Sequence, residues 1–352
     1  MKDKRNILCH IIGFGVVFIC VFFLLERCFF NKCDILYSWY RVQDVEEDID
    51  VLILGNSHAF TSTNAAVLEE AMNERGGLNC EVFASSSQNM ELTLVHLKTA
   101  LEYKKPKYIL LEVFSPILDN KATLAEGGPK GNLLMDLDGI HNYADKFSAL
   151  CNLVDWKSMP EGMFQLCRPA HRWDRWNIKR NRKIKVSNTH GYEAASTAKS
   201  FATGTKRVED IENACKAAYS NHELEELADY NRDALVEFLD ITKQNGINVV
   251  LYKAPTMRTD DFGRVNEVFA IAKDYDNVVL CQDTRCDMLE MGLELEDFYD
   301  DGHLNKRGGE KFTYYFGNLL SAELDLPIDW DRVYAYKGEK IECLADGQFM
   351  YS

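Results

Sequence analysis

The sequence has none of the short motifs that hold a nucleotide or a structural zinc ion. No GxxxxGK[ST] or GxGxxG pattern occurs among its 352 residues, so neither a P-loop nor a dinucleotide-binding turn is predicted. The 11 cysteines include no CxxC pair, so neither a zinc ribbon nor a thioredoxin-like site is indicated. Basic charge is also scarce: the formal net charge is -15, which argues against non-specific binding of nucleic acid. We therefore expect no cofactor, no metal and no nucleic-acid partner.

The cysteines leave two disulfide pairings open. Cys28 with Cys33, or Cys281 with Cys286, would each close a short loop, and spacing alone does not decide between paired and free thiols. Cys80 and Cys281 lie at predicted strand ends, where a free cysteine is usually a small core residue.

The N-terminus contains one long apolar run. Residues 7–25, ILCHIIGFGVVFICVFFLL, include His10 as the only clearly polar side chain. As a helix the run would be about 28 Å long, close to the roughly 30 Å of a hydrocarbon core. A cleaved signal peptide is the alternative, but the run is longer than a signal-peptide core and no A-x-A-like site follows. We predict an uncleaved single-pass anchor in the cytoplasmic membrane, which contacts the bilayer through residues 7–25. Because Lys2, Lys4 and Arg5 precede the run, the N-terminus would stay inside and the rest of the chain would be extracytoplasmic.

From residue 50 onward, apolar runs alternate with helical patterns. Five runs are typical of buried strands, at 50–55, 80–84, 107–114, 247–255 and 277–281. Helices are predicted over 64–75, 90–103, 223–244, 266–274 and 307–324. This alternation predicts an α/β fold, a flavodoxin-like three-layer sandwich with a five-stranded parallel sheet, preceded by the transmembrane helix. In such sheets, ligand sites lie at the carboxyl ends of the strands.

The same patterns divide the chain into parts. Residues 1–30 would form the cytoplasmic tip and anchor, residues 31–49 a connector, and residues 50–352 the α/β domain. The alternation breaks at about 115–222, which we interpret as an insertion over the strand ends, either a lid or a substrate module.

Polar side chains follow the first strand at the point where a helix should begin. In VLILGNSHAF, Gly55 ends the strand, and Asn56, Ser57 and His58 come next. This arrangement exposes the Ser57 hydroxyl at the rim of the sheet and aims helix N-terminal N–H groups at the same place, which suits a developing oxyanion. A serine needs a base to become a nucleophile, and His303, just before the last helix, is the natural candidate.

An aspartate upstream of His303 would complete the arrangement. Asp300 lies three residues before the histidine and can accept its other ring N–H, which fixes the tautomer and stabilises the imidazolium. Asp301 competes for this role, but the spacing favours Asp300 and leaves Asp301 as a turn or cap residue. His58 competes as the base. Because neighbouring side chains at a helix start point apart, we interpret it as a rim or packing residue.

Two sequence blocks together resemble those of the SGNH/GDSL hydrolase superfamily. They are GNSH after the first strand and DDGH at 300–303, followed by LNKRGGEKF, and the resemblance covers roughly residues 50–324 without the insertion. The anchor and the layout ILGNSHAF…FASSSQN look most like the extracytoplasmic branch that includes alginate O-acetylation proteins and the teichoic acid D-alanyl transfer protein.

That resemblance implies a membrane-anchored O-acyl esterase or O-acyltransferase. It implies an acyl-enzyme on Ser57, with His303 as the base and Asp300 as its orienter. The implied substrate is an O-acyl ester, acetyl above all, of a cell-surface polysaccharide. A partner membrane protein that delivers the acyl group is implied in the same way.

The oxyanion hole departs from the pattern of the superfamily. That pattern has a glycine after the second strand and an asparagine after the third, whereas this chain has Ser87 in SSSQN and no asparagine in EVFSP. Backbone N–H groups of Ser57 and Ser87 still serve, and Gln88, Asn89 or Asn56 are candidates for the missing donor. Loss of one donor costs on the order of 10²–10³ in rate. The alternative function is therefore a catalytically weak or inactive module that binds a surface glycan or scaffolds an export complex.

Three further residues are candidates for substrate binding. Arg258 follows the fourth strand and can reach the rim to bind an anion, although an ordinary surface arginine fits its position equally well. Arg172 and Trp173 belong to the basic run 168–185, which holds eight Lys or Arg among 18 residues. Such a run suits a polyanionic wall polymer or anionic lipid headgroups, and tryptophans can stack on sugar rings. A solvated helix with its aromatic side chains turned inward is the alternative.

Overall fold

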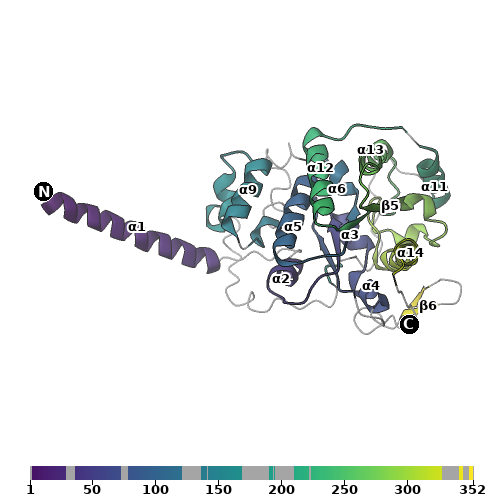
Figure 1. The fold of residues 1–352 in the computed structure, drawn as a ribbon, viewed down its shortest axis with the longest axis horizontal. Helices are drawn as coiled ribbons and strands as arrows, with labels where there is room; N and C mark the ends of the chain where they lie inside the picture. The colour runs from purple at the N-terminus through teal and green to yellow at the C-terminus, as the bar shows by residue number, and fades with distance from the viewer. Residues whose placement is uncertain are drawn as a thin grey trace.

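The structure is a computed structural model of the chain. It describes residues 2–28, 36–72, 78–120, 136–140, 142–168, 190–192, 194, 210–221, 223–326, 341–343 and 349–351. A single long helix, α1 (Lys2–Cys28), projects from an α/β body (Figure 1).

A five-stranded parallel sheet forms the centre of that body. Its strands are β1 (Val51–Gly55), β2 (Cys80–Ala84), β3 (Tyr108–Glu112), β4 (Asn248–Lys253) and β5 (Val278–Asp283). They lie in the order β2-β1-β3-β4-β5, and every neighbouring pair is parallel. This is the flavodoxin-like order, in which the chain reverses its direction of winding between β1 and β3. The predicted fold class is confirmed.

Helices cover both faces of the sheet. Alternate strand residues point to opposite faces, and a cluster of buried apolar side chains lies on each. One cluster includes residues of α2 (Leu36–Gln43), α5 (Met90–Tyr103), α12 (Asp229–Gln244) and α13 (Phe262–Ala272). The other includes residues of α3 (Ser57–Ser62), α4 (Ala65–Met72) and α14 (Lys306–Leu324). The three layers fix the strand ends, so the residues that follow each strand meet at one edge.

Helix α1 is apolar along most of its length. Residues Asn6–Glu26 have a mean hydropathy of 2.8, and every residue of that stretch before Glu26 is exposed or only partly buried. Among the helices that the structure describes, it alone is long and apolar enough to cross a membrane, judged by length and composition. This agrees with the predicted N-terminal membrane helix.

The insertion contributes helices beside the sheet. Its described elements are α6 (Phe114–Ile117), α9 (Tyr143–Leu153), α10 (Met159–Met163), the 3-10 helix η2 (Gln165–Cys167) and α11 (Ile211–Ser220). Helix α9 packs against α5, and α11 packs against the 3-10 helix η4 (Thr284–Asp287). Helix α9 therefore extends the helical layer that contains α5, whereas α11 lies against the segment that follows β5 (Figure 1). The lid or substrate module stays a prediction, because residues 121–135, 169–189 and 195–209 of the insertion lie outside the described residues. Arg172 and Trp173 lie outside the described residues.

Several local expectations differ from the structure. Part of the expected connector forms α2, whose Trp39 is 1% exposed and belongs to the core. Helix α12 begins at Asp229, six residues later than predicted. Cys281 and Cys286 are free thiols, so that disulfide does not form, while the other pairing lies outside the described side chains. The 3-10 helix η5 (Leu295–Asp297) precedes the DDGH turn, and β6 (Ile341–Cys343) pairs with β7 (Phe349–Tyr351) near the C-terminus.

Candidate active site

Ser57 lies at a tight turn between strand β1 and helix α3. Gly55 ends the strand with φ +152°, a backbone conformation that side-chain-bearing residues rarely adopt. Asn56 caps the helix, because its Oδ1 accepts the backbone N–H of His58 at 3.0 Å. Ser57 is the first residue of α3 and stays partly exposed at the sheet edge. The predicted geometry at this strand end is therefore present, although α3 has only 6 residues and so adds little helix dipole.

Three side chains form a continuous hydrogen-bonded series at this edge. Ser57 Oγ lies 2.8 Å from His303 Nε2, and His303 Nδ1 lies 2.8 Å from Asp300 Oδ1. The same Asp300 oxygen accepts the backbone N–H groups of Gly302 at 2.9 Å and of His303 at 3.0 Å. The turn that carries the histidine is thus built around the aspartate. The structure brings together the three residues that the sequence analysis predicted, although Ser57 and His303 are 246 positions apart along the chain.

The two neighbouring aspartates have different environments. Partial burial alone would raise the pKa of Asp300, but the hydrogen bond and charge of His303 and the backbone N–H groups of the turn outweigh it and lower that pKa. Asp300 is therefore ionised at neutral pH. Asp301 is 4% exposed, and its backbone carbonyl accepts from Thr256 Oγ1 at 2.8 Å and from the Met257 N–H at 2.9 Å. Asp301 joins the DDGH turn to the segment after β4 and has no hydrogen bond to the His303 ring among the described contacts.

His58 lies behind the Ser57–His303 pair as a buried ring. It stacks on Phe114 with ring centroids 4.1 Å apart, and its centroid is 4.9 Å from that of His303. Burial, and then the positive charges of Lys253 and its other basic neighbours, lower the pKa of His58 well below the ordinary value, so the ring is neutral. Ser57 Oγ contacts His303 and not this ring. The position agrees with the packing role that the sequence suggested for His58.

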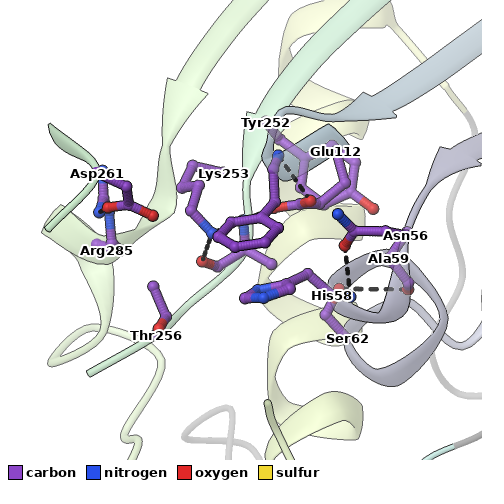
Figure 2. Close-up of polar contacts among 12 residues, drawn as sticks. Asn56, His58, Ala59, Ser62, Glu112, Tyr252, Lys253, Thr256, Asp261 and Arg285 are labelled. Carbon is purple, nitrogen blue, oxygen red and sulfur yellow. Dashed lines mark hydrogen bonds and ion pairs between the residues drawn. The ribbon is translucent and has the colours of Figure 1, made fainter. Parts of the chain in front are cut away.

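A buried ion pair lies beneath this ring. Lys253 and Glu112, the last residues of β4 and β3, have fully buried side chains with Nζ 3.3 Å from Oε1. The Lys253 ammonium also lies 5.1 Å from the centroid of the Phe114 ring. Burial raises the pKa of Glu112, and Lys253 together with two backbone N–H groups offsets part of that rise. Figure 2 shows Lys253 and Glu112 near His58, with the Arg285–Asp261 pair further away.

Sequence reasoning missed this ion pair, although a signal was present. Each charge stands at the end of an apolar strand, in YILLE and NVVLYK. A charged residue at the carboxyl end of a buried parallel strand indicates a polar centre at the sheet edge, because an unpaired charge there would be very costly.

The loop after β2 supplies a backbone donor next to Ser57. Gly55 and Ala84 are register partners at the ends of β1 and β2, so Ser87 follows on the strand adjacent to Ser57. Ser87 has φ +61° and is partly exposed. Neither the Ser57 N–H nor the Ser87 N–H donates a hydrogen bond to any described residue. Both groups are therefore free to bind a ligand oxygen, as the sequence suggested.

The neighbouring amide side chains hold this loop in place. Gln88 and Asn89 are both 0% exposed. Gln88 Oε1 accepts from the Ser85 N–H at 2.9 Å, and Asn89 Oδ1 caps α5 by accepting the Leu92 N–H at 3.1 Å. A ligand at the rim would not reach either amide without rearrangement. The NH₂ groups also have partners within the protein, because Gln88 Nε2 donates to Thr93 Oγ1 at 3.0 Å and Asn89 Nδ2 donates to Asn120 Oδ1 at 2.9 Å. Both side chains thus shape the loop, and an oxyanion role for Asn89 or Gln88 stays a prediction.

An asparagine does reach the Ser87 loop from beyond the third strand. Asn120 Nδ2 donates to the Ser87 carbonyl at 2.8 Å, and Asn120 Oδ1 accepts from Asn89 Nδ2 at 2.9 Å. No sequence signal pointed to it, because it lies eight positions after β3 ends and outside any recognisable motif. Asn120 fixes the shape of the loop through its carbonyl, and so fixes the direction of the Ser87 N–H.

Two other predicted binding residues lie close to the serine turn. Asn56 is 1% exposed, and its Nδ2 has no hydrogen-bond partner among the described residues, which makes it an uncommitted buried donor. Arg258 is partly exposed beside the His303 turn, 5.8 Å from the Phe114 ring, and forms an ion pair with Asp260 at 3.0 Å. A substrate anion at Arg258 would have to share the guanidinium with Asp260.

The comparisons with known proteins add no family to this geometry. No protein-family model, no curated protein and no solved structure matches the chain. Within the described residues, no group of three or more His, Cys, Asp or Glu side chains gathers at a spacing that could hold a metal ion.

Proposed function

We propose that this protein is a membrane-anchored serine hydrolase or acyltransferase that acts on O-acyl esters, acetyl above all, of a cell-surface polysaccharide. The observation that carries the proposal is the Ser57–His303–Asp300 series, with two hydrogen bonds of 2.8 Å. Nucleophile, base and orienter in this order are the arrangement that acyl transfer requires. The sequence resemblance to the SGNH/GDSL hydrolases, and to their extracytoplasmic acetylating branch, gives the substrate class.

In the proposed mechanism His303 Nε2 takes the proton of Ser57 as Oγ attacks the ester carbonyl. The negative oxygen of the tetrahedral intermediate accepts hydrogen bonds from the N–H groups of Ser57 and Ser87, neither of which donates to another residue that the structure describes. His303 then returns the proton to the leaving alcohol, and the ionised Asp300 stabilises the imidazolium between these steps. Water or a glycan hydroxyl resolves the acyl-enzyme, which makes the protein an esterase or a transferase respectively.

The proposed setting is the outer face of the cytoplasmic membrane. The apolar helix α1 supports an anchor, and the basic residues before it favour a cytoplasmic N-terminus. The domain would then meet a surface glycan directly. A transferase in this place also needs an acyl donor, for which we propose a partner membrane protein that delivers the acyl group.

The second candidate is an inactive module with the same fold that binds a surface glycan or scaffolds an export complex. The observation in its favour is the burial of Gln88 and Asn89, which leaves the backbone N–H groups of Ser57 and Ser87 as the oxyanion donors. If a third donor is required, the rate would fall by on the order of 10²–10³.

The test uses the full-length chain in detergent micelles and an activated acetyl ester. We expect turnover by the wild-type protein, an acetyl adduct on Ser57 by mass spectrometry, and loss of both in Ser57→Ala. Ser86→Ala, in the adjacent loop, is the matched control and should keep both. Equal turnover by the Ser57→Ala variant would remove this residue from the mechanism, and wild-type protein without turnover or adduct would favour the binding module.

A further inference from the structure

Exposed aromatic side chains gather on helix α9 and the turn that follows it. Tyr143 is 43% exposed, Phe147 is 42% exposed and Trp156 is 75% exposed. Tyr143 and Phe147 are four positions apart, so they lie on one face of α9. The rings of Phe147 and Trp156 have centroids 6.4 Å apart. These three residues, which we call the aromatic patch, form one continuous surface.

The aromatic patch adjoins the C-terminal end of the membrane helix. The Phe23 ring of α1 lies 5.9 Å from the Tyr143 ring and 6.1 Å from the Phe164 ring, and Phe22 lies 5.2 Å from Phe164. Glu26, the last residue of the apolar stretch, accepts the backbone N–H groups of Gln165 at 2.6 Å and Leu166 at 3.0 Å. Helix α1 is therefore attached to this part of the body through ring contacts with Tyr143 and Phe164 and through hydrogen bonds to the backbone that follows Phe164 (Figure 1).

The attachment determines the depth at which the patch lies. Phe23 precedes Glu26 by three residues, so it lies about 4.5 Å inside the end of the apolar stretch at 1.5 Å per residue. Any side chain in contact with Phe23 must lie at the boundary between hydrocarbon and headgroups when α1 spans a bilayer. Tyr143 makes that contact, and Phe147 is one turn further along the same face of α9.

We propose that the aromatic patch of Tyr143, Phe147 and Trp156 inserts into the headgroup layer of the bilayer that α1 crosses. Tyrosine and tryptophan favour this layer, because an apolar ring and a polar tip suit the boundary between lipid and water. An exposed apolar surface continuous with a membrane helix is covered by lipid without any further partner. Tyr219 provides a contrast: it is also 75% exposed, but it lies on α11, on the other side of the body from α1 (Figure 1).

The proposal has a consequence for the catalytic domain. With α1 held through Glu26 and Phe164, and the patch held by lipid, the body has two points of attachment to the membrane. A domain attached only through a flexible linker could rotate freely, whereas two attachments fix which face meets the bilayer. The Ser57 edge would then keep one height and orientation relative to the membrane surface.

The test uses the full-length chain, one molecule per phosphatidylcholine nanodisc, with a phospholipid that carries a diazirine close to its headgroup. After irradiation, lipid adducts are located by mass spectrometry of peptides. We expect adducts on the α1 peptide and on residues 143–157, and none on residues 211–220, which contain Tyr219. A single chain per disc excludes a second copy as the cover of the patch.

A double variant separates insertion from mere proximity. Phe147→Ser with Trp156→Ser should lose the adducts on residues 147–157 and keep those on α1 and on Tyr143, which stays in contact with Phe23, while Tyr219→Ser should change none of them. All three side chains are exposed, so these changes leave the core intact. Adducts confined to α1 in the wild-type protein would overturn the proposal. Adducts on residues 211–220 as strong as those on 143–157 would also overturn it, because the labelling would then follow exposure and not position.

Discussion

Replacement of Asp300 by asparagine tests the proposed reaction at its least redundant point. Asp300 Oδ1 lies 2.8 Å from His303 Nδ1 and is the only oxygen recorded on that ring nitrogen among the described contacts. An asparagine can turn its NH₂ toward Nδ1, which would place the proton on Nε2 and prevent this nitrogen from accepting the Ser57 proton. The substitution also removes the charge that stabilises the imidazolium. At about 4 Å and an effective dielectric constant of about 20, that charge contributes about 4 kcal/mol.

The two effects set the expected size of the loss. About 4 kcal/mol corresponds to roughly 10³ in rate, and a wrong tautomer alone costs about 10⁴ in a well-studied serine protease. We therefore expect kcat/KM for an activated acetyl ester to fall by roughly 10³–10⁴ in Asp300→Asn, mainly through kcat. The matched control is Asp301→Asn, because Asp301 holds Thr256 and Met257 through its backbone carbonyl, which the substitution keeps. The reasoning fails if Asp300→Asn retains more than about a tenth of the activity, or if both variants lose activity equally.

Two further predictions concern stability. Gly55→Ala would place a Cβ 2.8 Å from that of Ala59 and 2.9 Å from that of Glu112, in addition to backbone strain, so we expect a loss of roughly 2–4 kcal/mol in denaturant unfolding. Gly246→Ala, where φ is +67° but no atom lies within 4 Å, should cost only about 1–2 kcal/mol, and an equal loss at both sites would contradict the crowding argument. Burial raises the pKa of Glu81 from 4.5 to about 7. The protonated side chain therefore contributes folding stability that is fully present below about pH 4.5 and is lost as the pH rises through 7. Glu81→Gln should therefore gain up to about 3 kcal/mol relative to wild type between pH 5 and pH 8, and a difference that does not change with pH would refute the assignment.

The candidate site was predictable because its signals are local. A glycine at the end of an apolar strand followed by a serine places a hydroxyl at the sheet edge, and an aspartate three residues before a histidine allows one turn to orient the ring. Parallel topology then brings both segments to the same edge. The sequence could not predict which hydrogen-bond partners the side-chain amides of Gln88 and Asn89 would have. Asn89 binds Asn120, and Gln88 binds Ser85, through a loop conformation that no short motif encodes.

The errors in the fold arise from contacts between distant segments. Trp39 fits the core because Gly139 leaves room for it: a Cβ on that glycine would lie 2.0 Å from the indole. Likewise, the stretch before α12 has a helical composition, but the Glu225 N–H donates to the Gly263 carbonyl at 3.0 Å, and a Cβ on Gly263 would lie 2.7 Å from Glu225. Tertiary packing therefore overrides local propensity at both places.

The buried ion pair explains why the serine turn can be held so firmly. Glu112 accepts the backbone N–H groups of Phe114 and Ala254, so one carboxylate joins the ends of β3 and β4. Its Cβ also fills the space beside Gly55, which limits that position to glycine and defines the path of the chain into Ser57. Removal of the Lys253 charge would leave this carboxylate buried and unpaired, which is far more costly than the pair itself is favourable. The pair therefore acts on the site through backbone geometry, because Glu112 holds together the segments that follow β3 and β4 beside the serine turn.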